Sequence, residues 1–193
     1  MVSELVFIIL SARTQGGNHE AIYRRLRRHF GTWENVRDAS VSDVQRVIRE
    51  AGLSRVKARQ ITSLLRKITR DFGSLSAGAF RRMDTEHLER YLITLPGVGL
   101  KTARCVMLYA LDRAVFPVDT HCMRLFQNLG LIRARMRFEY AQEPLQAAVP
   151  EDIRYSLHVN AVAHGRETCV AVSPRCSSCA INLLCVNRRA AAS

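Results

Sequence analysis

Four cysteines gather near the carboxyl-terminal end of the chain at a spacing that can hold a metal. The pattern C-x6-C-x2-C-x5-C is formed by Cys169, Cys176, Cys179 and Cys185. Four thiolates this close in sequence can bind either a zinc ion or an iron–sulfur cubane. Zinc sites usually combine two separated C-x2-C pairs, and only one pair is present here. The residues alone therefore predict a metal site and leave both metals open. The other two cysteines, Cys105 and Cys122, lie on apolar helical stretches and are expected to be core thiols.

A lysine follows a glycine-containing turn between two predicted helices. Residues 95–103 read Leu-Pro-Gly-Val-Gly-Leu-Lys-Thr-Ala, so that Gly97 and Gly99 flank Val98 and precede Lys101. The two glycines allow a tight turn and a close approach of backbone N–H groups to a ligand, and the next helix N-terminus favours a phosphate. Burial and that helix end would both disfavour the charged form of the lysine, which suits a nucleophilic amine. The alternatives are an ordinary interhelical turn and a solvated or phosphate-binding lysine.

An aspartate stands 18 residues after this lysine. Asp119 lies in the sequence Phe-Pro-Val-Asp-Thr-His. An ionised carboxylate can stabilise positive charge that develops in a substrate, shuttle a proton or orient a water. The same residue is a favourable N-cap for the helix that follows. From the residues alone, capping and catalysis are equally open.

Helices must position these groups, because apolar residues recur throughout the chain at helical spacing. Such stripes occupy residues 22–30, 44–48, 61–72, 88–92, 103–111 and 123–126. Expected N-caps are Ser40 or Ser42, Asp84 and Asp119, and residues 73–78 are expected to form a loop. No convincing alternation predicts a strand. We therefore predict an all-α fold in two helical lobes, residues 1–112 and 113–193.

The charge balance indicates a polyanionic partner. The 193 residues include 29 Lys and Arg against 17 Asp and Glu, a net charge of +12 spread along the chain. The alternative is a surface that is merely basic. The first apolar run, residues 5–10, follows no basic residue and is too short to span a bilayer, so we expect an intracellular protein without a membrane partner. Six cysteines in that reducing compartment argue for metal or catalysis rather than disulfides.

Taken together, the segment 95–103, the Val-Asp-Thr-His sequence at 118–121 and the cysteine spacing resemble the endonuclease III family of helix-hairpin-helix DNA glycosylases. The resemblance extends from Val2 to about Arg188. It implies a two-lobed helical glycosylase fold with a substrate cleft between the lobes, across which Lys101 and Asp119 face each other. It also implies a [4Fe–4S] cluster, rather than zinc, on the four cysteines.

The resemblance further implies a role for each site residue. Lys101 would attack C1′ of a flipped nucleotide and leave a Schiff base, which permits β-elimination. Asp119 would stabilise the sugar as the base leaves. The hairpin backbone would grip the phosphodiester, with a bound monovalent cation, through Gly97, Val98 and Gly99.

Other residues are assigned by their position in the family pattern. Arg13 and Leu53 would fill the gap that a flipped base leaves, although Leu53 could equally pack in the core. His121 could face DNA or be a satisfied polar group. The cluster would fix a loop that presents Arg175 and Arg188 to DNA.

We therefore expect a bifunctional DNA glycosylase and AP lyase of base excision repair that removes damaged, oxidised pyrimidines. Its partner would be double-stranded DNA with a damaged base or an abasic site, and we expect a monomer, cytoplasmic and nucleoid-associated if bacterial. One alternative is a mismatch-thymine or 5-methylcytosine glycosylase, because the segment Gly99–Gly130, with Phe-Pro-Val-Asp-Thr at 116–120, is similar to plant Demeter-like glycosylases. The other is a non-catalytic DNA-binding protein, against which the retention of Lys101 and Asp119 argues.

Three departures from the family pattern bear on the substrate. Many relatives have glutamine where Arg13 stands, and the longer, charged side chain would read the opposite base differently. The segment 70–82 is longer than in the bacterial prototype. The chain also begins close to the first barrel helix, which we interpret as a truncation or a different partner surface.

Overall fold

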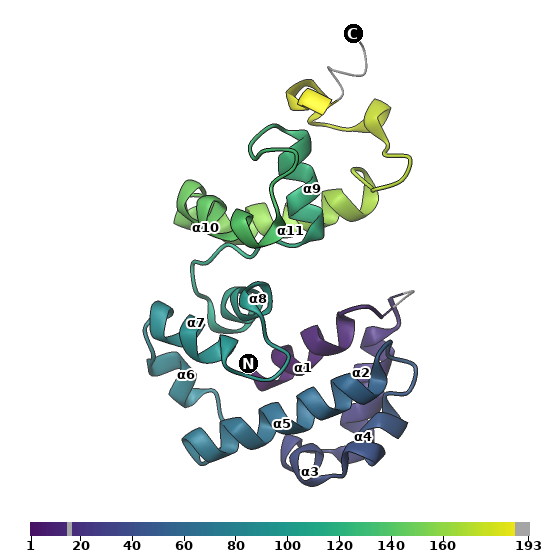
Figure 1. Cartoon of the computed structure of the whole chain (residues 1–193), viewed down its shortest axis with the longest axis vertical. Coiled ribbons are helices and arrows are strands. Elements are labelled where there is room, and N and C mark those ends of the chain that lie inside the picture. Colours follow the sequence, from purple (N-terminus) through teal and green to yellow (C-terminus); the bar gives the residue numbers. More distant parts are fainter. Residues whose placement is uncertain (15–16, 188–193) are drawn as a thin grey trace. The chain divides into compact units, whose positions relative to one another are not determined.

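The computed structural model describes residues 1–14 and 17–187 of the chain. These residues form helices joined by short connections, and no strand occurs among them (Figure 1). The predicted all-α fold is therefore confirmed. The chain divides into two compact units, Met1–Asp112 and Arg113–Ser193. No helix in the described ranges is both long and apolar enough to cross a membrane.

The first unit is a helical bundle built around its amino-terminal helix. Its elements are α1 (Val2–Ser11), α2 (His19–Phe30), α3 (Trp33–Asp38), α4 (Val41–Val47), α5 (Ser54–Phe72), α6 (Gly78–Arg82), α7 (Thr85–Ile93) and α8 (Leu100–Leu111). Helix α1 packs against α2, α5 and α8. Leu5, Val6 and Leu10 are buried on it, because most of its residues are apolar. Helix α1 therefore contacts both the long helix α5 and the helix that carries Lys101.

Local capping explains several helix boundaries in this unit. The Ser40 side chain accepts a hydrogen bond from the amide of Asp43, so that the predicted N-cap is Ser40 rather than Ser42. Asp84 caps α7 in the same way, as predicted. Helix α5 ends at Gly73, which has the positive φ of 72° that glycine tolerates best. The predicted loop 73–78 is confirmed over residues 73–77, and only its last residue, Gly78, belongs to a helix, because α6 begins there.

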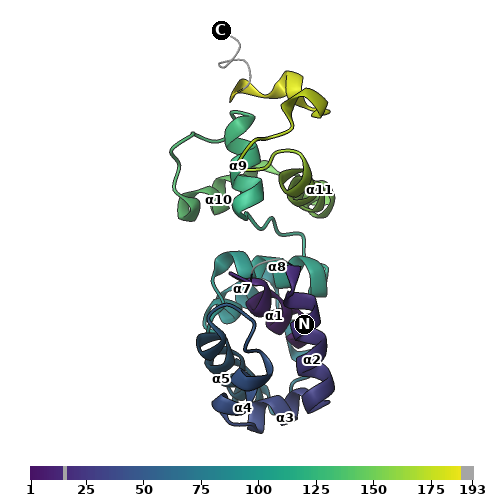
Figure 2. The same ribbon diagram turned by 90° about the vertical axis from the view of Figure 1, so that its right-hand side faces the viewer.

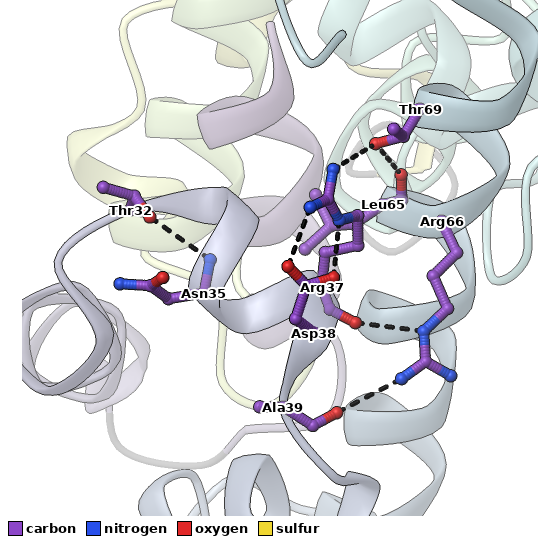
Figure 3. Close-up of polar contacts among 8 residues, drawn as sticks. All are labelled: Thr32, Asn35, Arg37, Asp38, Ala39, Leu65, Arg66 and Thr69. Atoms are coloured by element: carbon purple, nitrogen blue, oxygen red, sulfur yellow. Dashed lines mark hydrogen bonds and ion pairs between the residues drawn. The ribbon is translucent and has the colours of Figure 1, made fainter. Parts of the chain in front are cut away.

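Two arginines join α3 to α5 through hydrogen bonds (Figure 3). The Arg37 guanidinium pairs with the Asp38 carboxylate and donates to the hydroxyl of Thr69 on α5. Arg66 on α5 donates to the carbonyl oxygens of Arg37 and Ala39 at 3.0 and 3.2 Å, where α3 ends. These cations satisfy carbonyls at a helix C-terminus, which the helix dipole favours. These two arginines therefore stabilise the packing of α3 against α5.

The second unit packs three helices around a hydrophobic core. It contains α9 (Thr120–Asn128), α10 (Phe138–Ala148) and α11 (Arg154–Glu167), with the short 3-10 helices η2 (Glu151–Ile153), η3 (Cys176–Ser178) and η4 (Asn182–Leu184). Figure 2 shows α9 beside α11, and contacts between these two helices dominate the unit. Phe116, Phe126 and Cys122 are buried in this core, and Cys105 is buried in the first unit. The prediction that the two isolated cysteines are core thiols is confirmed.

Candidate functional site

The predicted hairpin joins α7 to α8 through a turn that only glycine can make at one position. Gly97 has φ of 81°, and a Cβ atom there would lie 2.7 Å from the Cδ of Gln60 on α5. Val98 is buried, and its amide donates to the carbonyl of Leu95 at 3.1 Å. Gly99 is exposed, and a Cβ atom at this residue would meet no protein atom within 4 Å. The packing of the described residues therefore requires glycine at Gly97 but not at Gly99.

Lys101 is the second residue of α8 and lies one turn before a buried ion pair. The lysine is half-buried at the N-terminal end of this 12-residue helix. One turn later, Arg104 is 3% exposed and its Nε lies 2.7 Å from the Glu89 Oε2 of α7. A second nitrogen of the same guanidinium reaches Oε1 at 3.5 Å. The two helices of the hairpin are thus held together by a two-point contact, which sequence reasoning missed.

The two residues assigned to gap filling lie next to each other in the first unit. Arg13 and Leu53 are exposed, and both have left-handed backbones, with φ of 53° and 60°. A Cβ atom on Gly52 would lie 2.4 Å from the carbonyl oxygen of Arg13, so the two loops touch through their backbones. Leu53 is 55% exposed, and the alternative that it packs in the core is therefore wrong. Sequence spacing gave no sign that these loops meet.

Asp119 belongs to the second unit, where it is the N-cap of α9. Its Oδ1 accepts hydrogen bonds from the amides of His121 and Cys122 at 2.9 and 2.8 Å. Burial acts to raise the pKa of Asp119, but the Cys122 hydrogen bonds and the charges of His121 and His158 outweigh it and leave the pKa below its ordinary value. The capping interpretation is confirmed, and it keeps the carboxylate ionised and fixed in direction.

A set of side-chain amides holds the extended segment that leads to Asp119. Gln142 on α10 pairs with the backbone of Val118, accepting from its amide at 3.2 Å and donating to its carbonyl at 2.9 Å. One turn later, Gln146 accepts a hydrogen bond from the amide of Phe116. These side chains satisfy backbone N–H and C=O groups of the extended segment, which in a sheet would be bonded to a neighbouring strand. Helix α10 therefore positions the aspartate, although no pattern in the sequence marked it for this role.

His121 is half-buried between α9 and α11. Its Nδ1 lies 3.2 Å from Nη2 of Arg124, and a Cβ atom on Gly165 would lie 2.6 Å from its Cβ. Arg124 in turn donates to the carbonyls of Gly165 and Cys169 at 2.6 and 2.7 Å. The imidazole thus has a polar contact within its own unit, and Arg124 ties α9 to the start of the cysteine segment.

The four cysteines of the predicted metal site surround one cavity. Its volume is about 340 Å³, and the lining includes Cys169, Cys176, Cys179, Cys185, Leu125, Ile181, His164 and Asn128. Among the described residues none of the cysteines forms a disulfide, and no cluster of three or more His, Cys, Asp or Glu side chains could hold a single metal ion. The four thiols therefore line one common space.

Polar groups contact three of these sulfur atoms. Asn128 donates through Nδ2 to the Sγ of Cys169 at 3.3 Å, and its carbonyl accepts from Cys185 at the same distance. Nε2 of His164 lies 3.6 Å from the Sγ of Cys179. Arg175 is exposed beside the cavity, whereas Arg188 lies outside the described residues.

Comparisons with known proteins agree across sequence and structure. A model of the HhH-GPD superfamily of base excision DNA repair proteins matches residues 6–151. Endonuclease III of Thermotoga maritima is 29% identical over 181 residues, which cover 94% of this chain and 80% of that protein. The solved structure of a non-covalent endonuclease III–DNA complex is 28% identical, with a TM-score of 0.84, and the match covers 98% of this chain and 84% of that one.

Plant proteins also match, over part of their length. Protein ROS1A of Oryza sativa subsp. japonica is 30% identical over 170 residues, which are 79% of this chain and 9% of that protein. A relative from Arabidopsis thaliana is 28% identical over 179 residues, and the chain spans 58% of its length. This chain thus corresponds to a limited region of these longer relatives.

Proposed function

Because this chain belongs to the HhH-GPD superfamily of base excision DNA repair proteins, we propose that it is a bifunctional DNA glycosylase and AP lyase that removes oxidised pyrimidines. The membership confirms the resemblance predicted from the hairpin, the aspartate sequence and the cysteine spacing. The single observation that carries the proposal is the position of Lys101, half-buried in the first turn of α8, directly after the Gly97–Gly99 turn. An amine beside a phosphate-binding turn is the group that base removal with strand cleavage requires.

In this proposal Lys101 is the nucleophile. Its amine attacks C1′ of the target nucleotide, the glycosidic bond breaks, and the base leaves with the bonding electrons and takes up a proton. The nitrogen then loses a proton, the C1′–O4′ bond breaks with protonation of O4′, and the opened sugar is joined to the lysine as a Schiff base, from which loss of a C2′ proton expels the 3′ phosphate. The braced pair of α7 and α8 supports this role, because Arg104 and Glu89 hold the helix on which the amine stands.

Asp119 acts as the ionised partner of this chemistry. Its carboxylate is kept charged by the amides of α9, and a fixed negative charge stabilises the positive charge that develops on the sugar. An aspartate that was only a cap could be replaced by asparagine without loss of function, because both are good N-caps. The catalytic and capping roles therefore make different predictions.

Double-stranded DNA with a damaged base or an abasic site is the proposed partner. The turn at residues 97–99 would receive a phosphate through its exposed backbone, and a monovalent cation could be bound there by carbonyl oxygens. The open space beside Gly99 supports this role, because the fold itself does not demand glycine at that position. Arg13 and Leu53 would occupy the gap in the duplex.

The cysteine cavity is the proposed site of a [4Fe–4S] cluster. Cys169, Cys176, Cys179 and Cys185 would hold it, and donors such as the Asn128 amide would set its electronic properties. The cluster supplies structural cross-linking of the loop when bound. The spacing of the four cysteines, with a single C-x2-C pair, supports the cluster rather than one zinc ion.

The proposed activity is tested with labelled duplexes that differ at one position. Nicking of an abasic duplex separates a lyase from the alternative of a non-catalytic DNA-binding protein, which would bind without cutting. A panel containing an oxidised pyrimidine, a G·T mismatch and 5-methylcytosine then identifies the base. Release from the oxidised pyrimidine at least about tenfold faster than from the others is expected, and the reverse order would overturn the substrate assignment.

A second candidate substrate is favoured by the plant relatives. The match to Protein ROS1A and to DEMETER-like protein 3 of Arabidopsis thaliana agrees with the similarity of residues 116–120 to Demeter-like glycosylases. In this alternative the same Lys101 and Asp119 remove a mismatched thymine or 5-methylcytosine. The panel above decides between the two.

A further inference from the structure

Lys57 is a buried cation whose charge has no carboxylate partner in the described part of the chain. The residue is 3% exposed on α5, and its Nζ donates to the carbonyl oxygen of Leu10 at 2.8 Å and to the hydroxyl of Thr14 at 2.7 Å. Both acceptors are neutral oxygens. Burial accordingly lowers the pKa of Lys57. Burying an ammonium with neutral partners is costly, and such a residue calls for an explanation beyond general packing.

The two acceptors lie on either side of Arg13. Leu10 is in the last turn of α1, where carbonyl oxygens lack partners within the helix, and that turn contains no basic residue of its own. A positive charge near a helix C-terminus is stabilising. At α1 this charge comes from the Lys57 ammonium, which is 47 residues away from Leu10 in the sequence. The Thr14 hydroxyl also donates to the Leu10 carbonyl at 2.5 Å, which closes the segment into a loop.

The same lysine is tied through its backbone to Leu53. The amide of Lys57 donates to the carbonyl of Leu53 at 3.0 Å in the first turn of α5. Leu53 and Arg13 both have left-handed backbones, which cost energy in residues other than glycine and therefore need support from their surroundings. The lack of a side chain on Gly52 allows the two loops to approach closely at the Arg13 carbonyl.

We propose that Lys57 is a positioning residue that holds Arg13 and Leu53 as one preformed element for entry into the DNA duplex. Its ammonium fixes both ends of the Arg13 loop, and its own helical turn begins at Leu53. Preforming the element removes the cost of ordering two loops when the base is flipped out. This inference rests on the proposed function for its consequence in DNA binding, but the clamp itself is a property of the free protein.

The clamp is tested first without DNA. Lys57→Met removes the ammonium and keeps the aliphatic stem, and Lys67→Met is the matched control, since it removes a lysine from the same helix. Hydrogen exchange is measured at the amides of Ala12 and Thr14, which are bonded to Ile8 and Ser11. We expect exchange about tenfold faster in Lys57→Met and unchanged in Lys67→Met. Unchanged exchange in Lys57→Met, or equal acceleration throughout α5 and α7, would overturn the proposal.

The threonine provides a second variant that leaves the buried lysine in place. Thr14→Val removes the hydroxyl that accepts from Lys57, whereas Thr14→Ser restores it. Thr14→Val is expected to accelerate exchange at Ala12, and Thr14→Ser to return it to within about twofold of the wild-type rate. A serine variant that behaves like the valine variant would show that the hydroxyl contact is not what holds the loop.

The consequence for DNA is tested with a duplex that contains one tetrahydrofuran abasic analogue and with the same duplex intact. Lys57→Met should lower the preference for the abasic duplex by about tenfold and change the affinity for the intact duplex by less than about twofold. Because Lys57 acts through Arg13 and Leu53, adding Lys57→Met to the double variant Arg13→Ala/Leu53→Ala should have little further effect. Additive losses would contradict the proposal. If the wild type shows no preference for the abasic duplex, the proposed function fails while the exchange experiment still tests the clamp.

Discussion

Both residues with proposed chemical roles stand at helix N-termini, and the helix serves each of them differently. Asp119 accepts two amide hydrogen bonds at the start of α9, so the helix stabilises its negative charge. Lys101 is in the first turn of α8, where, in the proposed function, the unbonded amides would attract phosphate oxygens and bring the substrate to the amine. A helix N-terminus thus fixes the Asp119 carboxylate, and in the proposed function a second helix N-terminus binds the DNA near Lys101.

Replacement of Asp119 by asparagine separates charge from capping. In Asp119→Asn the side-chain oxygen would still accept the amide hydrogen bonds of α9, so the stability of the protein should change by less than about 1 kcal/mol. Base release should nevertheless slow by about 10²-fold or more, because a neutral amide does not stabilise the sugar cation. Single-turnover excision and urea unfolding measure the two quantities. An asparagine variant with wild-type excision would restrict Asp119 to capping.

At the scale of elements, the sequence predicts the regular amphipathic helices. It does not predict which other elements each helix packs against. The stripe at 61–72 predicts α5, because one face of that helix is buried along its length. Helices α10 and α11 escaped prediction because α10 contains Pro144 internally and the apolar residues of α11 are not confined to one face. The contacts of Lys57 with Leu10 and of Gln142 with Val118 join residues far apart in sequence, which periodicity cannot show.

The brace between the hairpin helices gives a prediction at the same scale. Arg104→Met leaves the Glu89 carboxylate without its buried partner, and we expect a loss of about 3 kcal/mol in the free energy of unfolding. The control is Arg90→Met on α7, which breaks the exposed pair with Glu86 and should cost less than about 0.5 kcal/mol. Urea denaturation compares the two variants. Equal losses would mean that the buried pair does not brace the hairpin.

At the scale of the whole molecule, the net charge of +12 is divided between structure and ligand. Arg37 and Arg104 are engaged in contacts within the fold, whereas Arg13, Arg55 and Arg59 are exposed. The charge total therefore overstates the number of cations that DNA can meet. Neither this division nor the cavity between the four cysteines could be predicted from the sequence, since both depend on tertiary packing.

Salt dependence measures the number of cations that contact DNA. If about five phosphates are neutralised, the logarithm of the affinity should fall with the logarithm of salt concentration with a slope of about −4 to −5. Titration of an undamaged duplex by fluorescence anisotropy gives this slope. A slope near zero would indicate that the basic residues do not contact DNA phosphates.

The metal content tests the cavity assignment. Purified protein should be yellow-brown and contain about four irons per chain, and Cys179→Ser should lower the soluble yield because cluster binding is coupled to folding. Cys105→Ser, a buried cysteine outside the cavity, is the control and should keep the iron. Metal analysis and visible absorption supply the readout. One zinc per chain without visible absorption would identify the other metal.

The central claim is that the amine of Lys101 attacks the sugar, and borohydride trapping tests it most directly. Borohydride should reduce the transient imine and leave wild-type protein covalently joined to abasic DNA. Lys101→Gln should give no trapped species and still bind the duplex, because the turn at residues 97–99 and the basic surface remain. Trapping that persists in Lys101→Gln would place the nucleophile on another amine. Base excision by the wild type without any trapped species would show that an activated water performs the attack.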